Sequence, residues 1–412
     1  MTAPTGQGRT VRVHEVPGSG VVSIQVWLRG GARAEWIPGQ ASITGRMMVE
    51  GTHSRDWRKI STDAEELGMA LDSFGGFEVM GVSVEALAND WRVALEWALE
   101  LAREPSFPSD RCALLVRQNQ AEIQALGDQP EIRTAWRFLD QLYRPHPRCR
   151  PVQGTSRGLA RISRQRCAEL HSRSLAAGLI VSVAGEIDED EVRRLVDDLI
   201  EATGSEAATA ADPHPPKGMD LERQEVPLPA AEQAHLLAGH LTIARNHPDF
   251  PALQLLAVVL GAGSGLSGRL PLRVRVQEGL AYSVETGTSA GAGLDVGRLF
   301  VHIGTSPELL ERGELCVREE LARLVDEGPQ EAEVEEARSY LLGREPFRRE
   351  TPHQLAELSA AAELYGLPID DAEWTADRWR SVGAAEIAAA VRRHIRPDDL
   401  RITVGTPRVD RR

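Results

Sequence analysis

The sequence predicts an α+β protein of two similar domains, each an antiparallel β-sheet with helices packed mainly on one face. The main observation is that the order strand, helix, strands, helices, strand occurs twice, in about equal halves of the 412 residues. Between the halves, residues 203–222 are rich in Ala, Pro and small polar residues, which is typical of a linker. We therefore expect an N-terminal domain at residues 1–204, a linker at 205–222 and a C-terminal domain at 223–412.

The first half begins with an apolar, β-branched segment at 21–28, whose alternation predicts a strand. Gly30 and Gly31 turn the chain into a helix expected at 39–50. The strongest helical pattern follows at 90–103, with charged and apolar residues on different faces. The other elements expected in this half are helices at 58–67, from 109 onward, at 131–142, at 163–174 and from 188 onward, a hairpin or a long bent strand at 71–86, and a strand at 178–184.

The second half repeats this arrangement, with a strand expected at 233–243 and an apolar helix at 249–260. The glycine-rich segment 261–268 lacks the Lys and the spacing of a phosphate-binding loop, so we interpret it as a substrate-facing loop before a helix. The other elements expected here are strands at 281–288, 297–303 and 400–404 and helices at 306–328, 331–342, 351–365 and 384–394.

Composition excludes several classes of function. The net charge is −14, with 61 acidic and 47 basic residues, which argues against a nucleic-acid-binding protein because such a protein needs a basic face. No segment is apolar over the ~18 residues that a membrane helix needs, and the N-terminus lacks the apolar core of a signal peptide. The four cysteines form no Cys-x-x-Cys pair, so we expect free, buried thiols and a cytoplasmic location.

The segment from Gly39 to Thr52 reads Gly-Gln-Ala-Ser-Ile-Thr-Gly-Arg-Met-Met-Val-Glu-Gly-Thr. It resembles the zinc-binding helix of the pitrilysin/insulinase family, which includes the mitochondrial processing peptidases. In that family two His at i and i+4 hold one zinc ion, and a Glu between them acts as the general base. Here Ser42 and Arg46 stand at the two His positions and Gly45 stands at the position of the base. We therefore expect no metal in this chain.

The resemblance extends to the helix expected from residue 109 onward. Within Gln120-Ala-Glu-Ile123, Glu122 occupies the position of the third zinc ligand of the family, whereas Leu115 replaces a carboxylate seven residues earlier. A single carboxylate is no zinc site. We expect Glu122 to form a salt bridge with Arg46 where the metal stands in the family.

The second half contains the closest match. Residues 268–284 read Gly-Arg-Leu-Pro-Leu-Arg-Val-Arg-Val-Gln-Glu-Gly-Leu-Ala-Tyr-Ser-Val, similar to the family's Ser-Arg-Leu-(x)4-Arg-(x)3-Gly-Leu-Ala-Tyr-Ser-Val. By position, the Arg and Tyr that reach the zinc site in the family are Arg275 and Tyr282. The resemblance implies that the Arg holds the substrate backbone and that the Tyr hydroxyl donates to the oxyanion. A guanidinium and a phenol suit a developing negative charge.

In bacteria this family includes pairs of chains of about this length, of which one carries the zinc helix and the other the Arg and Tyr. The resemblance implies that this chain is the Arg/Tyr subunit of such a heterodimer, with zinc in the partner and a peptide as substrate. Two alternatives stay open: a scaffold without a part in proteolysis, and a homodimer that binds peptides without cutting them. An adjacent open reading frame with an intact His-x-x-Glu-His would favour the heterodimer.

Overall fold

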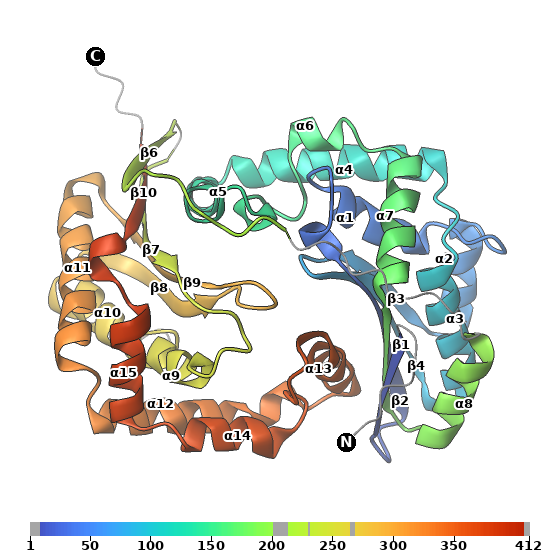
Figure 1. The fold of residues 1–412 in the computed structure, drawn as a ribbon. Coiled ribbons are helices and arrows are strands. Elements are labelled where there is room, and N and C mark those ends of the chain that lie inside the picture. The colour runs from blue at the N-terminus through green and yellow to red at the C-terminus, as the bar shows by residue number, and fades with distance from the viewer. Residues whose placement is uncertain (1–8, 201–212, 230, 264–267, 408–412) are drawn as a thin grey trace. The chain divides into compact units, whose positions relative to one another are not determined.

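The structure, a computed structural model, describes residues 9–200, 213–229, 231–263 and 268–407 (Figure 1). These residues form two compact units, each built around one five-stranded sheet. The first unit contains the described parts of Met1–Gln124, Arg150–His214 and Phe347–Asp371, and the second those of Ala125–Cys149, Pro215–Pro346 and Ala372–Arg412. Neither unit is continuous in sequence, because each takes one helical segment from the other half of the chain.

The sheet of the first unit has the strand order β1-β5-β2-β4-β3. β1 runs parallel to β5, with Val11 opposite Val181, and the other neighbouring pairs are antiparallel. The strands of this sheet are β1 (Arg9–Glu15), β2 (Val21–Arg29), β3 (Ala70–Gly75), β4 (Val79–Leu87) and β5 (Leu179–Gly185).

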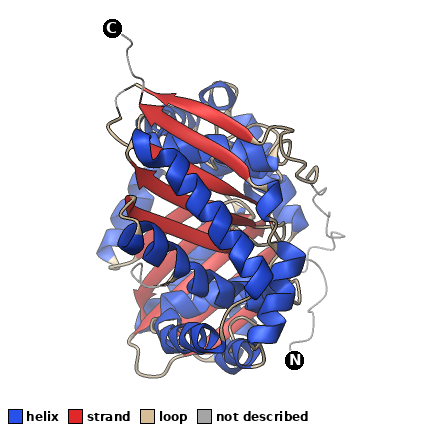
Figure 2. Ribbon diagram, turned by 90° about the vertical axis from the view of Figure 1, so that its left-hand side faces the viewer, coloured by secondary structure: helices blue, strands red, loops and turns tan. Residues whose placement is uncertain are grey.

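Both faces of this sheet are covered, because its apolar side chains point alternately to either side. On one face Val26 and Val82 belong to a core shared with α3 (Trp91–Arg103), α7 (Arg164–Ala177) and α8 (Glu189–Leu199). On the other face Trp27 and Ile180 pack against Ala360 and Leu364 of α13 (Pro352–Tyr365), which comes from the second half of the sequence. Figure 2 shows the helices of the described residues in blue and the strands in red.

The sheet of the second unit repeats the pattern with the order β6-β10-β7-β9-β8. β6 runs parallel to β10, and the other pairs are antiparallel. Its strands are β6 (Arg223–Leu228), β7 (Ala234–Leu241), β8 (Ala281–Ala290), β9 (Arg298–Thr305) and β10 (Arg401–Pro407).

The core of this second sheet also has two layers. Leu236 and Val301 face a large cluster that includes residues of α9 (Phe250–Leu260), α11 (Leu310–Glu327) and α15 (Ala384–His394). Leu237 faces the opposite side and packs with Phe138 and Leu142 of α5 (Pro130–Tyr143). The remaining α-helices of the described residues are α1 (Gln40–Arg46), α2 (Trp57–Glu66), α4 (Ser109–Gly127), α6 (Ser156–Leu159), α10 (Arg269–Pro271), α12 (Glu331–Arg344) and α14 (Ala372–Arg380).

The expected α+β class is confirmed, with two differences in detail. Each sheet contains one parallel pair, formed by an edge strand, β1 or β6, that the sequence patterns did not predict. Each sheet also has a helix on its second face, namely α13 or α5. Of the linker expected at 205–222, residues 213–222 are described and form no helix or strand, whereas 205–212 lie outside the described residues.

Two further expectations concern the whole chain. All four cysteines are buried and free, as expected. Among the described helices, none combines the length and the apolar character that crossing a membrane requires.

Candidate functional site

The candidate site of the first unit is the face of α1 that corresponds to the zinc-binding face of the resemblance. The helix begins after Gly39, whose φ of 93° is a left-handed conformation that favours glycine. The Glu35 carboxylate accepts hydrogen bonds from the backbone N–H groups of Gly39 at 3.2 Å and Ala41 at 3.0 Å. Burial raises the pKa of Glu35 to about 7, although these N–H groups and Arg150 favour the charged form. Glu35 thus fixes the start of α1.

The side chains of Ser42 and Arg46, one helical turn apart, are joined by a residue of α4. Asn119 Nδ2 donates to Ser42 Oγ at 3.0 Å, and Arg46 Nη1 donates to Asn119 Oδ1. Asn119 is fully buried and also donates to the Gln153 carbonyl at 3.4 Å. One amide therefore bridges the two positions at which the family has its histidines.

The ion pair expected between Arg46 and Glu122 is present, with Arg46 Nη1 and Glu122 Oε2 3.8 Å apart. It is a secondary contact, because the side chains are 33% and 44% exposed and an exposed ion pair contributes little. Arg46 also donates through Nη2 to Gln118 at 3.2 Å. Sequence reasoning missed Asn119, although a signal exists: it lies one helical turn before Glu122 and so on the same face of α4.

The position of the general base is closed by the backbone. A Cβ built on Gly45 would lie 2.5 Å from the Gly75 nitrogen and closer still to the Phe74 carbonyl, where real Cβ atoms keep at least 3.0 Å. On the other side of this contact, a Cβ on Gly75 would meet the backbone of Ala41 and Ser42. Helix α1 therefore packs backbone to backbone against β3, and only glycine fits at both positions.

These residues do not fit a zinc ion. Arg46 carries a positive charge at one ligand position, and Ser42 is a poor neutral ligand already bonded to Asn119. At Gly45 the backbone of β3 excludes a carboxylate side chain. The α1 face is therefore a hydrogen-bonded packing surface that lacks the means to bind the ion or activate water.

The second set of candidate residues lies in the second unit. Arg275 is half-buried on a single π-helical turn, η5 (Leu272–Gln277), that follows α10 directly. Single π turns inside helices are frequent at functional sites. The chain then turns at Gly279, whose φ is 63°, and enters β8, on which Tyr282 lies at a register shift between strands β8 and β9. The Tyr282 side chain lies outside the described residues.

The neighbouring arginines of this segment have structural partners. Arg269 pairs with both carboxylate oxygens of Glu333 at 2.7 Å and donates to the Gly328 carbonyl at 3.0 Å. Arg273 pairs with Glu319 of α11. These ion pairs attach the chain just before Arg275 to α11 and α12.

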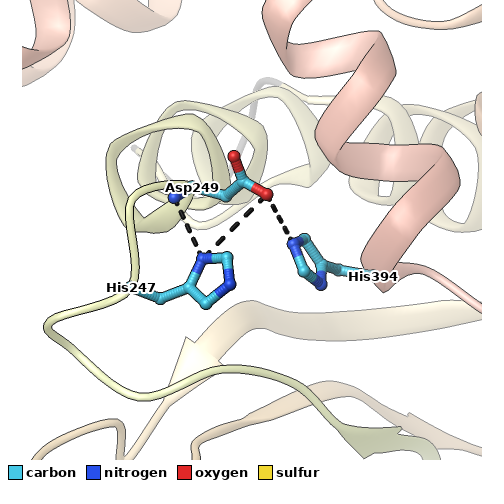
Figure 3. Close-up of side chains that lie close together, drawn as sticks. All are labelled: His247, Asp249 and His394. Atoms are coloured by element: carbon cyan, nitrogen blue, oxygen red, sulfur yellow. Dashed lines mark hydrogen bonds and ion pairs between the residues drawn. The ribbon is translucent and has the colours of Figure 1, made fainter.

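Two groups of side chains among the described residues bring His and carboxylate atoms within 4.8 Å of one another, close enough to consider a shared cation. Both groups lie in the second unit, whereas α1 belongs to the first. One contains His247, Asp249 and His394 (Figure 3), and the other contains Glu131, Glu285 and His302.

Each half of the chain matches a known protein-family model. Residues 10–156 match the family model described as insulinase (peptidase family M16), and residues 171–341 match the one described as the peptidase M16 inactive domain. The two matches together span most of the chain, including α1, Arg275 and Tyr282.

Individual relatives agree with these matches. An uncharacterized zinc protease of Mycobacterium leprae is 28% identical over 349 residues, covering 82% of this chain and 76% of the relative. A protein of Helicobacter pylori named a non-peptidase homolog is 21% identical, covering 89% and 84%. The fold is similar to that of a crystal structure of a peptidase M16 inactive domain from Pseudomonas fluorescens, with a TM-score of 0.90, 22% identity and coverage of 100% and 98%. From the two family matches, this chain belongs to the M16 (insulinase) peptidase family.

Proposed function

We propose that this chain is the non-zinc subunit of a heterodimeric zinc metallopeptidase. Members of this family often act in pairs. In the proposal, a partner subunit with an intact His-x-x-Glu-His helix holds the zinc, and both subunits act on one peptide, such as a precursor or leader peptide. A cytoplasmic location is part of the proposal and is supported by the four free thiols.

The observation that carries the proposal is the difference between the two candidate sites. On α1 the positions of the zinc site are closed by Asn119 and by the backbone of β3. The segment with Arg275 and Tyr282 instead keeps the family spacing, on a π turn and the strand that follows it. A chain that takes no part in proteolysis has no physical reason to retain Arg275 and Tyr282 once its zinc ligands are lost.

The proposed roles follow from the chemistry of the two side chains. The Arg275 guanidinium presents several fixed N–H donors, which suits main-chain carbonyl groups of an extended peptide. The Tyr282 hydroxyl donates one hydrogen bond to the oxygen that becomes negative when water attacks the peptide carbonyl. Neither role requires a metal in this chain.

The test is peptide hydrolysis by this chain alone, by a zinc-motif partner alone and by their mixture. We expect activity only in the mixture. Tyr282→Phe should lower kcat by ~100- to 1,000-fold, since one oxyanion donor typically has this effect. Arg275→Ala should lower kcat/KM, with a large share in KM because it binds the substrate backbone.

Two matched variants control for nonspecific effects. Tyr340→Phe removes a hydroxyl that accepts a hydrogen bond from Arg344 at 3.0 Å, and Arg380→Ala removes an exposed arginine that pairs with Glu373. Both should leave the activity of the mixture unchanged. If Tyr282→Phe is as active as these controls, the proposal is wrong.

A second candidate function is a scaffold with no part in proteolysis. It is favoured by the closed zinc face and by the similarity to a protein named a non-peptidase homolog. A partner that hydrolyses peptides equally well with and without this chain would establish this alternative.

A further inference from the structure

A cluster of two carboxylates and two imidazoles lies on one face of the second sheet, outside the residues assigned above. His302 on β9 stands directly opposite Glu285 on β8 in the antiparallel register. His235 on the neighbouring strand β7 lies beside His302, with the rings stacked at a centroid distance of 5.4 Å. Glu131, in the first turn of α5, reaches the same place from the helix that covers this face.

The orientation of His302 divides its two ring nitrogens between two partners. Its Nε2 lies 3.1 Å from His235 Nδ1, a hydrogen bond. Its Nδ1 lies 3.9 Å from Glu131 Oε1, and the nearest atoms of Glu131, Glu285 and His302 are all within 4.8 Å. The His302 side chain is 6% exposed, so its ring is held in place by the surrounding residues. Metal-binding histidines typically have this arrangement, in which the second ring nitrogen is bonded to a neighbour.

The charges of the cluster favour a cation. Two carboxylates face the imidazole of His302, and among the described residues no arginine or lysine forms an ion pair with Glu131 or Glu285. The N-terminus of α5 stabilises the charge of Glu131. This helix terminus does not stabilise the charge of Glu285, which lies on strand β8 and faces the same imidazole. A divalent ion between them would compensate both charges.

We propose that Glu131, Glu285 and His302 bind a divalent transition-metal ion, with His235 orienting His302 through the hydrogen bond to Nε2. Ligand atoms lie about 2.0–2.2 Å from such an ion, so two of them lie roughly 3 to 3.5 Å apart. The observed separations need only small rotations of two exposed glutamate side chains. Mixed imidazole and carboxylate ligands suit Zn²⁺ or Mn²⁺ better than Mg²⁺ or Cu⁺.

The other cluster, at His247, Asp249 and His394, has its donor atoms already in use (Figure 3). Arg393 holds both oxygens of Asp249, at 2.9 and 3.0 Å, and His394 Nε2 lies 2.6 Å from Oδ2. His247 Nδ1 accepts the backbone N–H of Asp249 at 3.1 Å. A cation here would have to displace a guanidinium, so this cluster is an ion-pair network and serves as an internal control.

The experiment is a titration of the tag-free, metal-stripped full chain with Zn²⁺ by calorimetry, and with Co²⁺ by visible absorption. We expect one saturable site. Glu285→Gln and His302→Gln should each weaken binding at least ~10-fold, and His235→Phe by ~10- to 100-fold, as for residues that orient a metal ligand. His247→Gln should bind as tightly as the unchanged chain, and Mg²⁺ should not compete.

Glutamine has nearly the same shape as glutamate, and the Glu285 side chain is exposed. Glu285→Gln therefore tests the site even if the His302→Gln variant fails to fold. Circular dichroism of each variant checks the fold. Absence of a saturable site, equal affinity in Glu285→Gln, or loss of binding in His247→Gln would each overturn the proposal. No partner subunit or peptide is needed, so the result is independent of the proposed proteolytic role.

Discussion

Replacing Gly45 by alanine tests whether α1 is closed against a zinc site by its packing on β3. The new Cβ would lie 2.5 Å from the Gly75 nitrogen, where ordinary van der Waals contact needs at least 3.4 Å. The obstacle is backbone on both sides, so no side-chain rotation relieves it, and helix and strand must separate by about 1 Å. Overpacking of this kind costs about 1–3 kcal/mol of the free energy of unfolding.

A matched glycine gives the opposite expectation. Gly343 lies in α12, and a Cβ there would meet no atom within 4 Å. Gly343→Ala should therefore stabilise the chain by about 0.5–1 kcal/mol, the ordinary helical preference of alanine over glycine. The two variants should differ by at least about 1.5 kcal/mol in urea unfolding followed by circular dichroism.

The functional extension is the triple replacement Ser42→His, Gly45→Glu and Arg46→His, which rebuilds the zinc motif in the sequence. We expect neither zinc binding at α1 nor peptidase activity, because the Glu side chain has no room against β3. A stable Gly45→Ala variant, or a triple variant that binds zinc and cuts peptides alone, would refute this reasoning.

Two further predictions concern stability. His240 is buried, its Nε2 accepts the backbone N–H of Arg396 at 3.0 Å, and burial lowers its pKa from 6.5 to about 4. Because the unfolded chain takes up the proton first, the stability is complete above pH 6.5 and is lost as the pH falls toward 4; between about pH 7 and about pH 5 the loss is about 2 kcal/mol. His240→Gln should flatten this part of the pH profile in urea unfolding, and an unchanged slope would contradict the assignment. Asn119→Ala leaves the buried hydroxyl of Ser42 and the partly buried guanidinium of Arg46 without their shared partner, so it should cost about 1–3 kcal/mol. A loss below about 0.5 kcal/mol, typical of a surface position, would show that the bridge carries little stability.

The sequence was sufficient for elements whose stability is local or strongly periodic. The apolar strand β2, the amphipathic helix α3 and the duplicated order of elements were all predictable from spacing alone. The edge strands β1 and β6 were not, because their parallel pairing with β5 and β10 depends on residues far along the chain. The positions of α13 and α5 on the second faces of the sheets are likewise set by tertiary packing.

The candidate sites show the same division. Ser42, Gly45, Arg46 and Glu122 were identifiable because they occupy motif positions at fixed spacing. The bridging role of Asn119 was not, because it follows from how α4 packs on α1. The proposed metal site could not be predicted from the sequence either, because its residues come from α5 and three strands and share no local motif.

The exchange of helices between the units decides how this chain can be divided. A chain cut within residues 213–222 would leave α13 on the fragment without the first sheet and α5 on the fragment without the second. Each fragment alone would expose the sheet face that carries Trp27 or Leu237. The two pieces would therefore be obligate folding partners, able to complement one another without a covalent link but unable to stand as separate domains.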